Sequence, residues 1–359
     1  MADTIRTLAV NPGGMTTRIA VYVERERVFE ATVEHSREDL AEFAAIPDQL
    51  DLRKEAVERA LEEGGQVGEH FDAIVGRGGL LRSIPSGAYR VTDQMLEDAR
   101  VGYHGQHASN LGPLLADALS RDLGGRAFIV DPVSVDEFGP LARFSGHRDI
   151  ARKSLGHALN TKATARKAAA LLDRPLRSVN MIVAHLGSGI SITPLLKGRM
   201  IDVNNAASGG PFSPERTGAL PLVEMFDFML KNGIDPSRMK QIVTREGGLM
   251  SYLGHNDFKE AVRLVAEGDD EVTAIVHAMA YQIAKEIGAM ATTLSGDVQA
   301  VVLTGSLAYS DLLVGMISER VSFIGEIMVL PGENELESLA MGALEVLRGR
   351  EEAREYPSA

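Results

Sequence analysis

Residues 8–22 of the chain read LAVNPGGMTTRIAVY, two apolar runs joined by a turn rich in glycines, amides and hydroxyls. The runs Leu8–Val10 and Ile19–Val23 predict two strands, and RVFEATVE (residues 27–34) predicts a third. Two residues such as Asn-Gly are enough to join antiparallel strands. The longer turn therefore indicates a hairpin whose loop has a task besides reversing the chain.

The same pattern returns in the second half of the chain. Residues 180–203, NMIVAHLGSGISITPLLKGRMIDV, are again strand, glycine-rich turn, strand, Lys-Gly turn and strand. When the two stretches are aligned, Gly13 falls on Gly187 and Asn11 falls on His185. We interpret this as a segmental duplication, which predicts two copies of one domain.

Buried strands and helices alternate after the first hairpin. FDAIVGRGG (residues 71–79) and AFIVDP (residues 127–132) predict buried strands, and LGPLLADALSRDLGG (residues 111–125) predicts a helix between them. Parallel strands separated by helices and joined to a meander indicate an α/β domain.

The predicted boundaries follow from this duplication. We expect the second copy to follow a long helix over 149–173, and the closing helix 333–350 to pack back on the first copy. The prediction is an N-terminal domain over residues 1–150 and a C-terminal nucleotide-binding domain over residues 151–332. Within the C-terminal domain, residues 221–294 are predicted to form a helical insert. Within the insert, Asp235-Pro236 predicts a helix start.

Composition narrows the function classes. The 359 residues suit two domains, and 45% hydrophobic with 24% charged residues is ordinary for a globular protein. A net charge of −13 argues against nucleic acid and anionic membranes as partners, because phosphate contacts need clustered Lys and Arg. Without cysteine there is no disulfide, thiolate metal site or cysteine nucleophile. With no signal peptide or long apolar run recognised, we expect a soluble cytoplasmic protein.

The glycine-rich turns favour phosphate binding. Glycine lets the backbone approach a phosphate closely, and successive N–H groups form an anion-binding concavity. One such hairpin is more often only a turn, but here two fall in register and VLTGS (residues 302–306) adds a third turn after a buried strand. No Walker loop occurs in the chain.

An ordered set of motifs resembles butyrate kinases, within the acetate and butyrate kinase family of the actin, sugar-kinase and heat-shock chaperone superfamily. The motifs span essentially the whole chain: NPGGMTTR (11–18), VGRGG (75–79), HASNLG (107–112), VDPV (130–133), HLGSGIS (185–191), SPERTG (213–218), VLTGS (302–306) and PGENELESLAMGALEVL (331–347). The resemblance implies two duplicated ribonuclease-H-like domains with an active-site cleft between them. It also implies ATP, Mg²⁺ and a short-chain carboxylic acid as ligands, and an acyl phosphate as the product of direct in-line transfer. We expect a homodimer or a larger homo-oligomer.

The resemblance assigns roles to residues of the first hairpin. It places four of them near the transferring phosphate: Asn11, Gly13, Thr16 and Arg18. Butyrate kinases usually read Ser-Thr-Ser where this chain has Gly14-Met15-Thr16, so two hydroxyl donors are lost. We expect weakened rather than abolished function, and we expect Met15 to cover the core.

Two arginines and three histidines match family positions. Arg77 and Arg216 would neutralise the transferring phosphoryl group, since a guanidinium is always charged and forked; the alternative for each is a surface ion pair. His157 would stabilise the transition state by a hydrogen bond. His185 would shape the nucleotide site, and for His107 we favour a structural role. No general base is required, because a carboxylate substrate is already ionised near pH 7.

Two carboxylates match the family's magnesium positions, directly or through water. These are Asp131, which ends a buried strand, and Glu335, which begins the last helix. The alternatives are a turn cap for Asp131 and a favourable helix-start charge for Glu335. Glu337 is the competing candidate for the second position.

The nucleotide is expected on the second domain. Gly187, Ser188 and Gly189 would face its β- and γ-phosphates, and Gly305-Ser306 its α-phosphate or adenosine. The family more often has two glycines at the latter place, so Ser306 either narrows the nucleoside site or caps the following helix.

The apolar acid pocket has candidates in Ile84, Pro85 and Pro132-Val133. Two other readings remain open: a nucleotide-binding sensor of the same fold, favoured by Gly14-Met15, and a superfamily kinase acting on a sugar hydroxyl.

Overall fold

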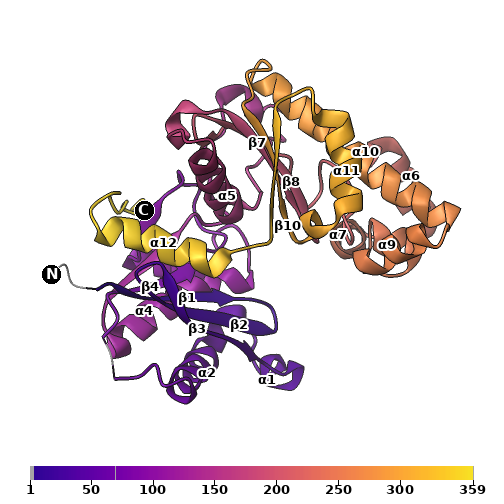
Figure 1. Cartoon of the computed structure of the whole chain (residues 1–359). Coiled ribbons are helices and arrows are strands. Elements are labelled where there is room, and N and C mark those ends of the chain that lie inside the picture. Colours follow the sequence, from indigo (N-terminus) through magenta and orange to yellow (C-terminus); the bar gives the residue numbers. More distant parts are fainter. Residues whose placement is uncertain (1–3, 69, 359) are drawn as a thin grey trace. The chain divides into compact units, whose positions relative to one another are not determined.

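The computed structural model of the chain describes residues 4–68 and 70–358 (Figure 1). It divides into two compact units, Met1–Asp136 with Asn334–Ala359, and Glu137–Glu333.

The first unit is built on a six-stranded sheet in the order β3-β2-β1-β4-β6-β5. Strands β1, β2 and β3 form an antiparallel meander, while β4 and β6 continue parallel to β1. Strand β1 is apolar and almost wholly buried because it is central, whereas edge strand β3 alternates exposed and half-buried residues. The strands are β1 (Arg6–Pro12), β2 (Thr16–Val23), β3 (Glu26–Glu34), β4 (Ala73–Arg77), β5 (Ala88–Arg90) and β6 (Arg126–Val130).

Helices cover both faces of this sheet. Helix α4 packs on β4 and β6 and against α2, and α12 packs on β1, β4 and β6; Figure 1 shows α12 on one side of the strands and α2 with α4 on the other. The core between the sheet and helices α2 and α4 includes Val10, Val57 and Leu115. The helices are α1 (Arg37–Ala41), η1 (Ile46–Gln49), α2 (Leu50–Glu63), α3 (Asp93–Val101), η2 (Ala108–Asn110), α4 (Leu111–Leu123) and α12 (Glu335–Leu347).

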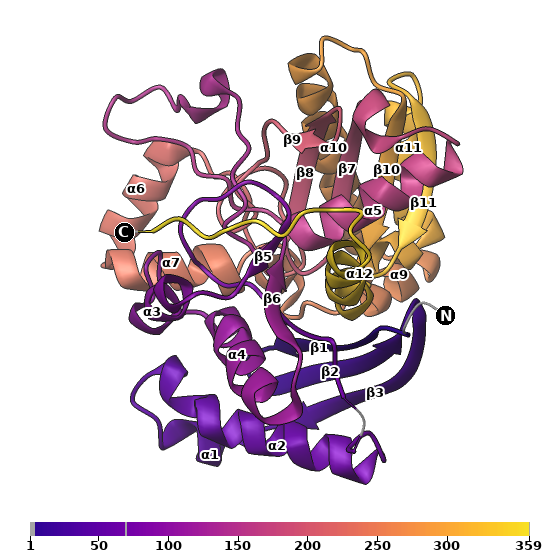
Figure 2. The same cartoon turned by 90° about the vertical axis from the view of Figure 1, so that its left-hand side faces the viewer.

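The second unit repeats the arrangement of the first. Its sheet has the order β11-β10-β7-β8-β9, with an antiparallel meander of β7, β8 and β9, and β10 and β11 parallel to β7. Figure 2 shows these strands side by side. The duplicated α/β architecture is therefore confirmed. The strands are β7 (Met181–Leu186), β8 (Ile190–Leu196), β9 (Arg199–Met200), β10 (Ala300–Gly305) and β11 (Glu326–Pro331).

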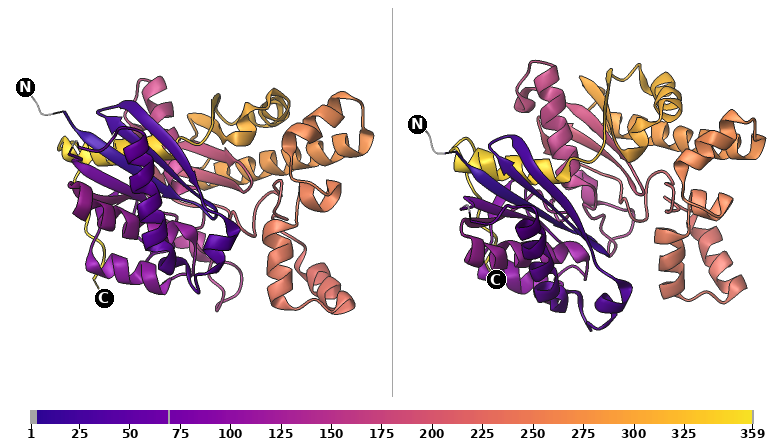
Figure 3. Two further views of the ribbon diagram at one scale, coloured as in Figure 1. Left: turned by 90° about the horizontal axis from the view of Figure 1, so that it is seen from below. Right: turned by 60° about the horizontal axis from the view of Figure 1, so that its bottom comes forward.

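The helices of the second unit fall into two groups. Helix α5 packs on β7 and β10. Within residues 221–294 (salmon to orange in Figure 3), α10 packs on β8 and α11, and the shorter helices α6, α7, α8 and α9 precede it in the chain. Asp235 caps α7 as predicted, accepting from the N–H groups of Ser237 and Arg238. The helices are η3 (Pro140–Arg143), α5 (Ala158–Leu171), η4 (Leu176–Ser178), α6 (Leu222–Asn232), α7 (Pro236–Arg245), α8 (Leu249–Leu253), α9 (Phe258–Ala266), α10 (Asp270–Thr293), η5 (Ser306–Tyr309) and α11 (Asp311–Val321).

The predicted long helix over 149–173 is wrong at its start, because α5 begins only at Ala158. The preceding segment uses its backbone groups elsewhere. The carbonyl of Leu155 accepts from the N–H of Ala206, and the N–H of His157 donates to Ser191 Oγ. These bonds tie the segment to the second sheet and its neighbouring loop instead of closing helical turns.

Among the described residues, no helix combines the length and the apolar character that crossing a membrane requires.

Candidate functional site

Three predicted residues of the first unit form one cluster at the ends of their elements. Asn11 is near the end of β1, Arg77 ends the neighbouring parallel strand β4, and Glu335 begins α12. The Arg77 guanidinium is forked onto the Glu335 carboxylate, with Nη2 3.0 Å from Oε1 and Nη1 3.2 Å from Oε2. The Asn11 amide also donates to Glu335 Oε2 and lies 3.4 Å from Arg77 Nη1 through its Oδ1. Ligand contacts gather at such strand ends in open α/β sheets.

Glu337, the competing carboxylate, lies in a different environment. Burial raises the pKa of the Tyr22 phenol, and the negative charge of Glu337 adds to that rise. Glu337 therefore acts on Tyr22 of β2, and Glu335 is the carboxylate that meets Asn11 and Arg77.

The magnesium assignment meets competing contacts. One oxygen of buried Asp131 accepts from Ser86 Oγ and from the Gly87 N–H at 2.8 Å, and both oxygens of Glu335 are bound to Arg77. In the described part of the chain, no three His, Asp or Glu side chains gather where they could hold a metal. Because Mg²⁺ is usually held by one or two carboxylates together with substrate phosphates, the metal roles of Asp131 and Glu335, directly or through water, stay a prediction.

Arg18 has a surface partner. It lies opposite Asn11 in the β1–β2 register, and its Nη2 is 3.1 Å from Glu30 Oε1 on β3 in an exposed ion pair. The structure therefore joins Arg18 to β3 rather than to the Arg77–Glu335 pair.

The turn of the first hairpin differs from the sequence expectation at Met15. Its side chain is 43% exposed, so the expectation that it covers the core is wrong. The reason is that Gly14 and Met15 form the tip of the turn, whose carbonyls are held from behind by Arg53 of α2. Gly13 and Thr16 close the turn, the Gly13 N–H donating to the Thr16 carbonyl at 2.7 Å.

Two predicted histidines of the second unit lie together. The rings of His157 and His185 are stacked, with centroids 3.8 Å apart and planes 13° apart. His185 Nδ1 is 2.8 Å from the amide nitrogen of Asn160, and His185 Nε2 is 3.2 Å from Glu333 Oε1. If Asn160 donates, Nδ1 is an acceptor and the proton sits on Nε2, facing Glu333.

His157 is oriented by strand β8. The His157 Nδ1 is 3.0 Å from Ser191 Oγ, and the backbone N–H of His157 donates to the same hydroxyl. The ring therefore stands at the start of α5, stacked on His185. In contrast, His107 caps η2 by accepting from the Ser109 N–H, which agrees with the structural role expected for it.

Side chains approach the glycines of the second hairpin closely, most of all at Gly189. A Cβ on Gly189 would lie 2.2 Å from Arg216 Nη1, and a Cβ on Gly187 would lie 3.1 Å from His185 Nε2. Arg216 donates from Nη1 to the Ala206 carbonyl at 2.7 Å, and burial lowers its pKa. Because residues 187 and 189 carry no side chain, the His185 ring and the Arg216 guanidinium can both lie against the same turn.

The third glycine turn lies against the end of the second hairpin. Gly305 has φ +89°, and a Cβ on it would lie 2.3 Å from the Leu186 carbonyl oxygen. The following Ser306 is exposed and does not cap α11; Ser310 does, by accepting from the Leu313 N–H. The capping alternative for Ser306 is therefore wrong, since η5 intervenes between it and α11.

Ser306 and Ser188 line the same pocket of the second unit. It has a volume of about 490 Å³. Its walls combine apolar and polar side chains, as small-molecule sites usually do. The lining residues are Ser188, Pro214, Asn256, Asp257, Phe258, Lys259, Val262, Ser306, Leu307, Tyr309 and Ser310.

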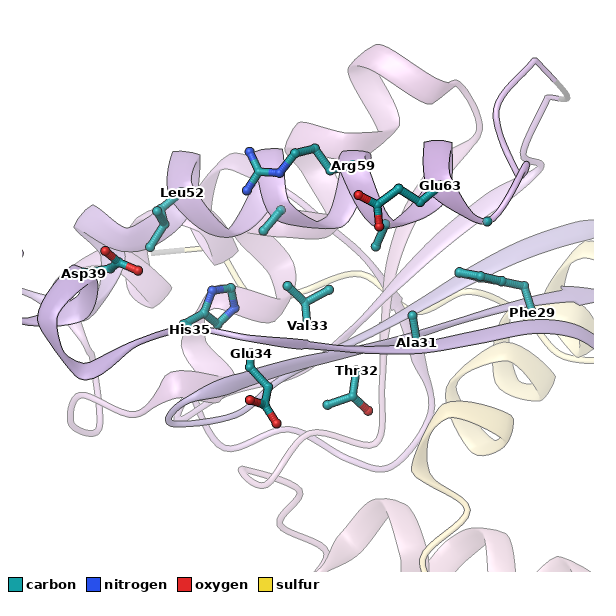
Figure 4. Close-up of a pocket in the computed structure, with 13 residues that line it drawn as sticks. Phe29, Ala31, Thr32, Val33, Glu34, His35, Asp39, Leu52, Arg59 and Glu63 are labelled. Atoms are coloured by element: carbon teal, nitrogen blue, oxygen red, sulfur yellow. The ribbon is translucent and has the colours of Figure 1, made fainter.

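A second pocket, of about 520 Å³, lies between β3 and α2 in the first unit (Figure 4). None of the predicted site residues lines it. Its walls include His35 and Arg59, and Figure 4 shows the His35 ring directed toward the α2 side.

Sequence reasoning missed the residues that hold these groups in place. They are Arg53 behind the first hairpin, and Asn160, Ser191, Ser213 and Glu333 around the second. One signal was available: Ser191 stands two residues after Gly189 and ends the motif HLGSGIS. Ser213 and Glu333 lie within the motifs SPERTG and PGENELESLAMGALEVL, whereas Arg53 and Asn160 stand in none of the motifs and are distant in sequence from the residues they contact.

Two repeats of this sheet order, each with a glycine-rich hairpin at the same place, define a two-domain fold found among small-molecule kinases. A ROK hexokinase from Thermus thermophilus shares it with a TM-score of 0.51 at 14% identity, over 96% of this chain and 99% of that one. The chain belongs to the acetokinase family, whose model matches residues 148–327.

Solved structures agree on the fold. The chain is similar to Porphyromonas gingivalis acetate kinase, with a TM-score of 0.80 at 15% identity over 96% of this chain and 100% of that one. It is also similar to a propionate kinase from Francisella tularensis subsp. tularensis SCHU S4, with a TM-score of 0.75 at 18% identity over 94% and 98%. At these identities the likeness establishes the carboxylate-kinase fold.

Proposed function

We propose that the chain transfers the γ-phosphoryl group of ATP to a short-chain fatty acid, butyrate or a branched analogue, giving an acyl phosphate and ADP. The observation that carries the proposal is the second hairpin of an acetokinase-family chain. Its glycines lie against Arg216 at one position and His185 at another, and His157 is stacked on His185. Phosphoryl transfer asks mainly for such positioned donors and cationic charge.

The proposed step balances without a proton. A carboxylate oxygen attacks the γ-phosphorus, the bond from that phosphorus to the β–γ bridging oxygen breaks, and ADP leaves with the electron pair. The acid is ionised near pH 7, so no base is needed. Magnesium would enter on the phosphates of the nucleotide, which usually carry it into kinase sites.

Residues of the second unit would act on the nucleotide. The amides of Gly187, Ser188 and Gly189 would face the β- and γ-phosphates, and Arg216 would neutralise the charge that grows on the transferring group. His157 would donate a hydrogen bond to that group. The pocket beside Ser306 would take the adenosine.

Residues of the first unit would act on the acid and on the transferring group. Asn11 and the amides of its hairpin would contact the phosphoryl oxygens, and Arg77 would supply the cationic end of the acid site. Ile84 is a candidate for the apolar wall, since it is buried and pairs with Val135 beyond the Asp131 turn. Glu335 would hold the Arg77 fork in place.

We also propose a homo-oligomer, supported by helix α6. Most of its residues are apolar, yet none of them is buried in the described part of the chain. Leu222, Val223, Phe226 and Leu230 are all exposed, and Leu230 is 83% exposed. Exposed apolar surface of this kind is typical of contacts between subunits. Sedimentation velocity of the wild type and of Phe226→Glu would test it, because a monomeric wild type contradicts the proposal.

A nucleotide-binding sensor is the second candidate, and two observations favour it. The first hairpin lacks the usual hydroxyls at Gly14 and Met15, and Arg77 is already paired with Glu335. A sensor would bind ATP without producing acyl phosphate.

Hydroxamate trapping tests both candidates. The chain is incubated with ATP, Mg²⁺ and hydroxylamine, and with acetate, propionate, butyrate, isobutyrate or isovalerate in turn. We expect acyl hydroxamate to form, most rapidly with the four- and five-carbon acids. Faster turnover of acetate would contradict the butyrate preference alone, while ATP binding without any hydroxamate would support the sensor.

A further inference from the structure

Arg53 in α2 is a fully buried cation for which the described part of the chain provides no anionic partner. The side chain is 0% exposed, and all its hydrogen-bond acceptors among the described residues are uncharged. Buried arginines are normally paired with a carboxylate. Burial lowers the pKa of Arg53 to about 10, so the group still carries its charge near pH 7. Such an arrangement needs a specific explanation.

The acceptors are the turn of the first glycine-rich hairpin. Nη1 donates to the carbonyls of Gly13 at 2.9 Å and Thr16 at 3.1 Å, and Nη2 donates to the carbonyl of Gly14 at 2.8 Å. Gln49 accepts from Nε at 3.1 Å and from Nη2 at 3.0 Å, which fixes the plane of the fork. The Arg53 guanidinium therefore binds three of the four carbonyls in the turn of residues 13–16.

Because each peptide unit is planar, the direction of these carbonyls also fixes the direction of the N–H groups on the opposite face of the turn. In a trans peptide the C=O and the following N–H point in opposite directions. With the Gly13 and Gly14 carbonyls directed at Arg53, the N–H groups of Gly14 and Met15 point away from it, at the exposed tip. The Met15 carbonyl is taken as well, by the His35 N–H at 2.9 Å. The turn presents donors because its acceptors are occupied.

We propose that Arg53 is a positioning residue that aims the Gly14 and Met15 amides at the transferring phosphoryl group. The proposal rests on the function proposed above. Its importance follows from the sequence of the turn, because Gly14 and Met15 bring no hydroxyl and leave the backbone amides as the donors at the tip. The buried positive charge behind the turn also attracts an anion on the other side.

A purely structural role for Arg53 predicts a different outcome, so the test separates the two. Arg53→Lys keeps the charge but replaces the fork by a single nitrogen that cannot reach three carbonyls with the same geometry. Arg82→Lys is the matched control, because Arg82 is a partly buried arginine of the same unit whose guanidinium binds Asp98 instead of a turn. Gln49→Leu is a milder variant that removes only the acceptor orienting the fork.

The measurements are steady-state kcat and KM, melting temperature, and backbone amide exchange. We expect Arg53→Lys to lower kcat about 10- to 100-fold, the scale for a misplaced catalytic contact, with KM for ATP within about threefold. Gln49→Leu should fall between that variant and the wild type. Arg82→Lys should keep kcat within about twofold even if it lowers the melting temperature equally.

Two results would overturn the proposal. One is an Arg53→Lys kcat equal to that of Arg82→Lys at similar stability. The other is unchanged exchange of the peptide over residues 9–20 in Arg53→Lys, since loss of the fork should speed exchange there and leave residues 183–194 as in the wild type. If wild type forms no acyl phosphate, the proposed function fails, and the exchange result still decides whether Arg53 holds the turn.

Discussion

The two glycine-rich hairpins occupy equivalent places in the two units but use arginine in opposite ways. In the first, Arg53 binds the carbonyls of the turn itself. In the second, Ser213 donates its hydroxyl to the Ser188 carbonyl, and Arg216 lies against Gly189 while donating to a carbonyl of another loop, Ala206. The turns also differ in length, since four residues (13–16) separate the paired strands of the first hairpin and three (187–189) separate those of the second.

The difference teaches what each glycine is for. Gly189 leaves room for a guanidinium, whereas a Cβ on Gly14 would meet nothing within 4 Å. Glycine at the second turn is thus a steric requirement of the site. At the tip of the first turn the space beside Gly14 is open, so a larger side chain could stand there without a steric clash.

The largest effect is expected at the second hairpin. Arg216→Ala removes the cation beside the turn, and we expect turnover to fall at least about a hundredfold, the scale for losing one preorganised donor. ATP binding should change less, because the target charge grows on the transferring group. Stopped-flow turnover and nucleotide titration measure the two effects; activity within a few-fold of wild type would remove Arg216 from the catalytic assignment.

A matched pair of alanines compares the glycines directly. Gly189→Ala should displace the Arg216 guanidinium, since the new methyl would lie 2.2 Å from Nη1, and lower kcat by about 10- to 100-fold. Gly14→Ala should keep kcat within about twofold because its φ is not positive and the space is open. Equal losses in the two variants would contradict the distinction drawn between the turns.

Restoring the missing hydroxyls should produce a smaller change in the other direction. The double variant Gly14→Ser with Met15→Thr adds two donors at an exposed tip, where water competes, so we expect a gain in kcat of about three- to tenfold. Acid preference should not change. Because the Met15 side chain is 43% exposed, the replacement should leave the melting temperature nearly unaltered. No gain in an active enzyme would show that the tip does not contact the phosphoryl group through side chains.

The smallest effect is a pH dependence of stability that arises at the first hairpin. Burial and the Arg53 charge lower the pKa of His35 to about 4, with Asp39 opposing the shift. The unfolded chain gains a proton as pH falls below about 6.5 while the folded chain does not, so stability present above that pH is lost between about 6.5 and 4. The slope is at most about 1.4 kcal/mol per pH unit.

Structure explains why His35 stays neutral. Thr17 Oγ1 accepts from Arg53 Nη1 at 3.1 Å, which leaves its own proton for His35 Nε2 at 2.9 Å. Urea unfolding of the wild type and of His35→Gln between pH 7.5 and 5 measures the effect. The difference between them should shrink or reverse with acid, and two parallel curves would contradict it.

Local pattern was sufficient for the strands, the turns and the duplication. Apolar runs joined by glycine-rich turns identified both hairpins, and alignment of the two stretches placed Gly13 on Gly187. The local pattern gave a wrong prediction at residues 149–157, which were expected to be helical. This segment instead forms hydrogen bonds with Ala206 and Ser191, which lie elsewhere in the unit. Tertiary hydrogen bonds outweighed local propensity there.

Side-chain partners were the part that the sequence left open. The sequence by itself determined the two-copy α/β fold, the glycine turns, and the set of candidate arginines, histidines and carboxylates, because strand period and turn chemistry are local properties. Only the tertiary structure decided that Glu335 pairs with Arg77, that His157 stacks on His185, and that Arg53 lies behind the first turn. These contacts join residues far apart in the chain, and which charges meet depends on how helices pack on the sheets, which no single stretch of sequence encodes.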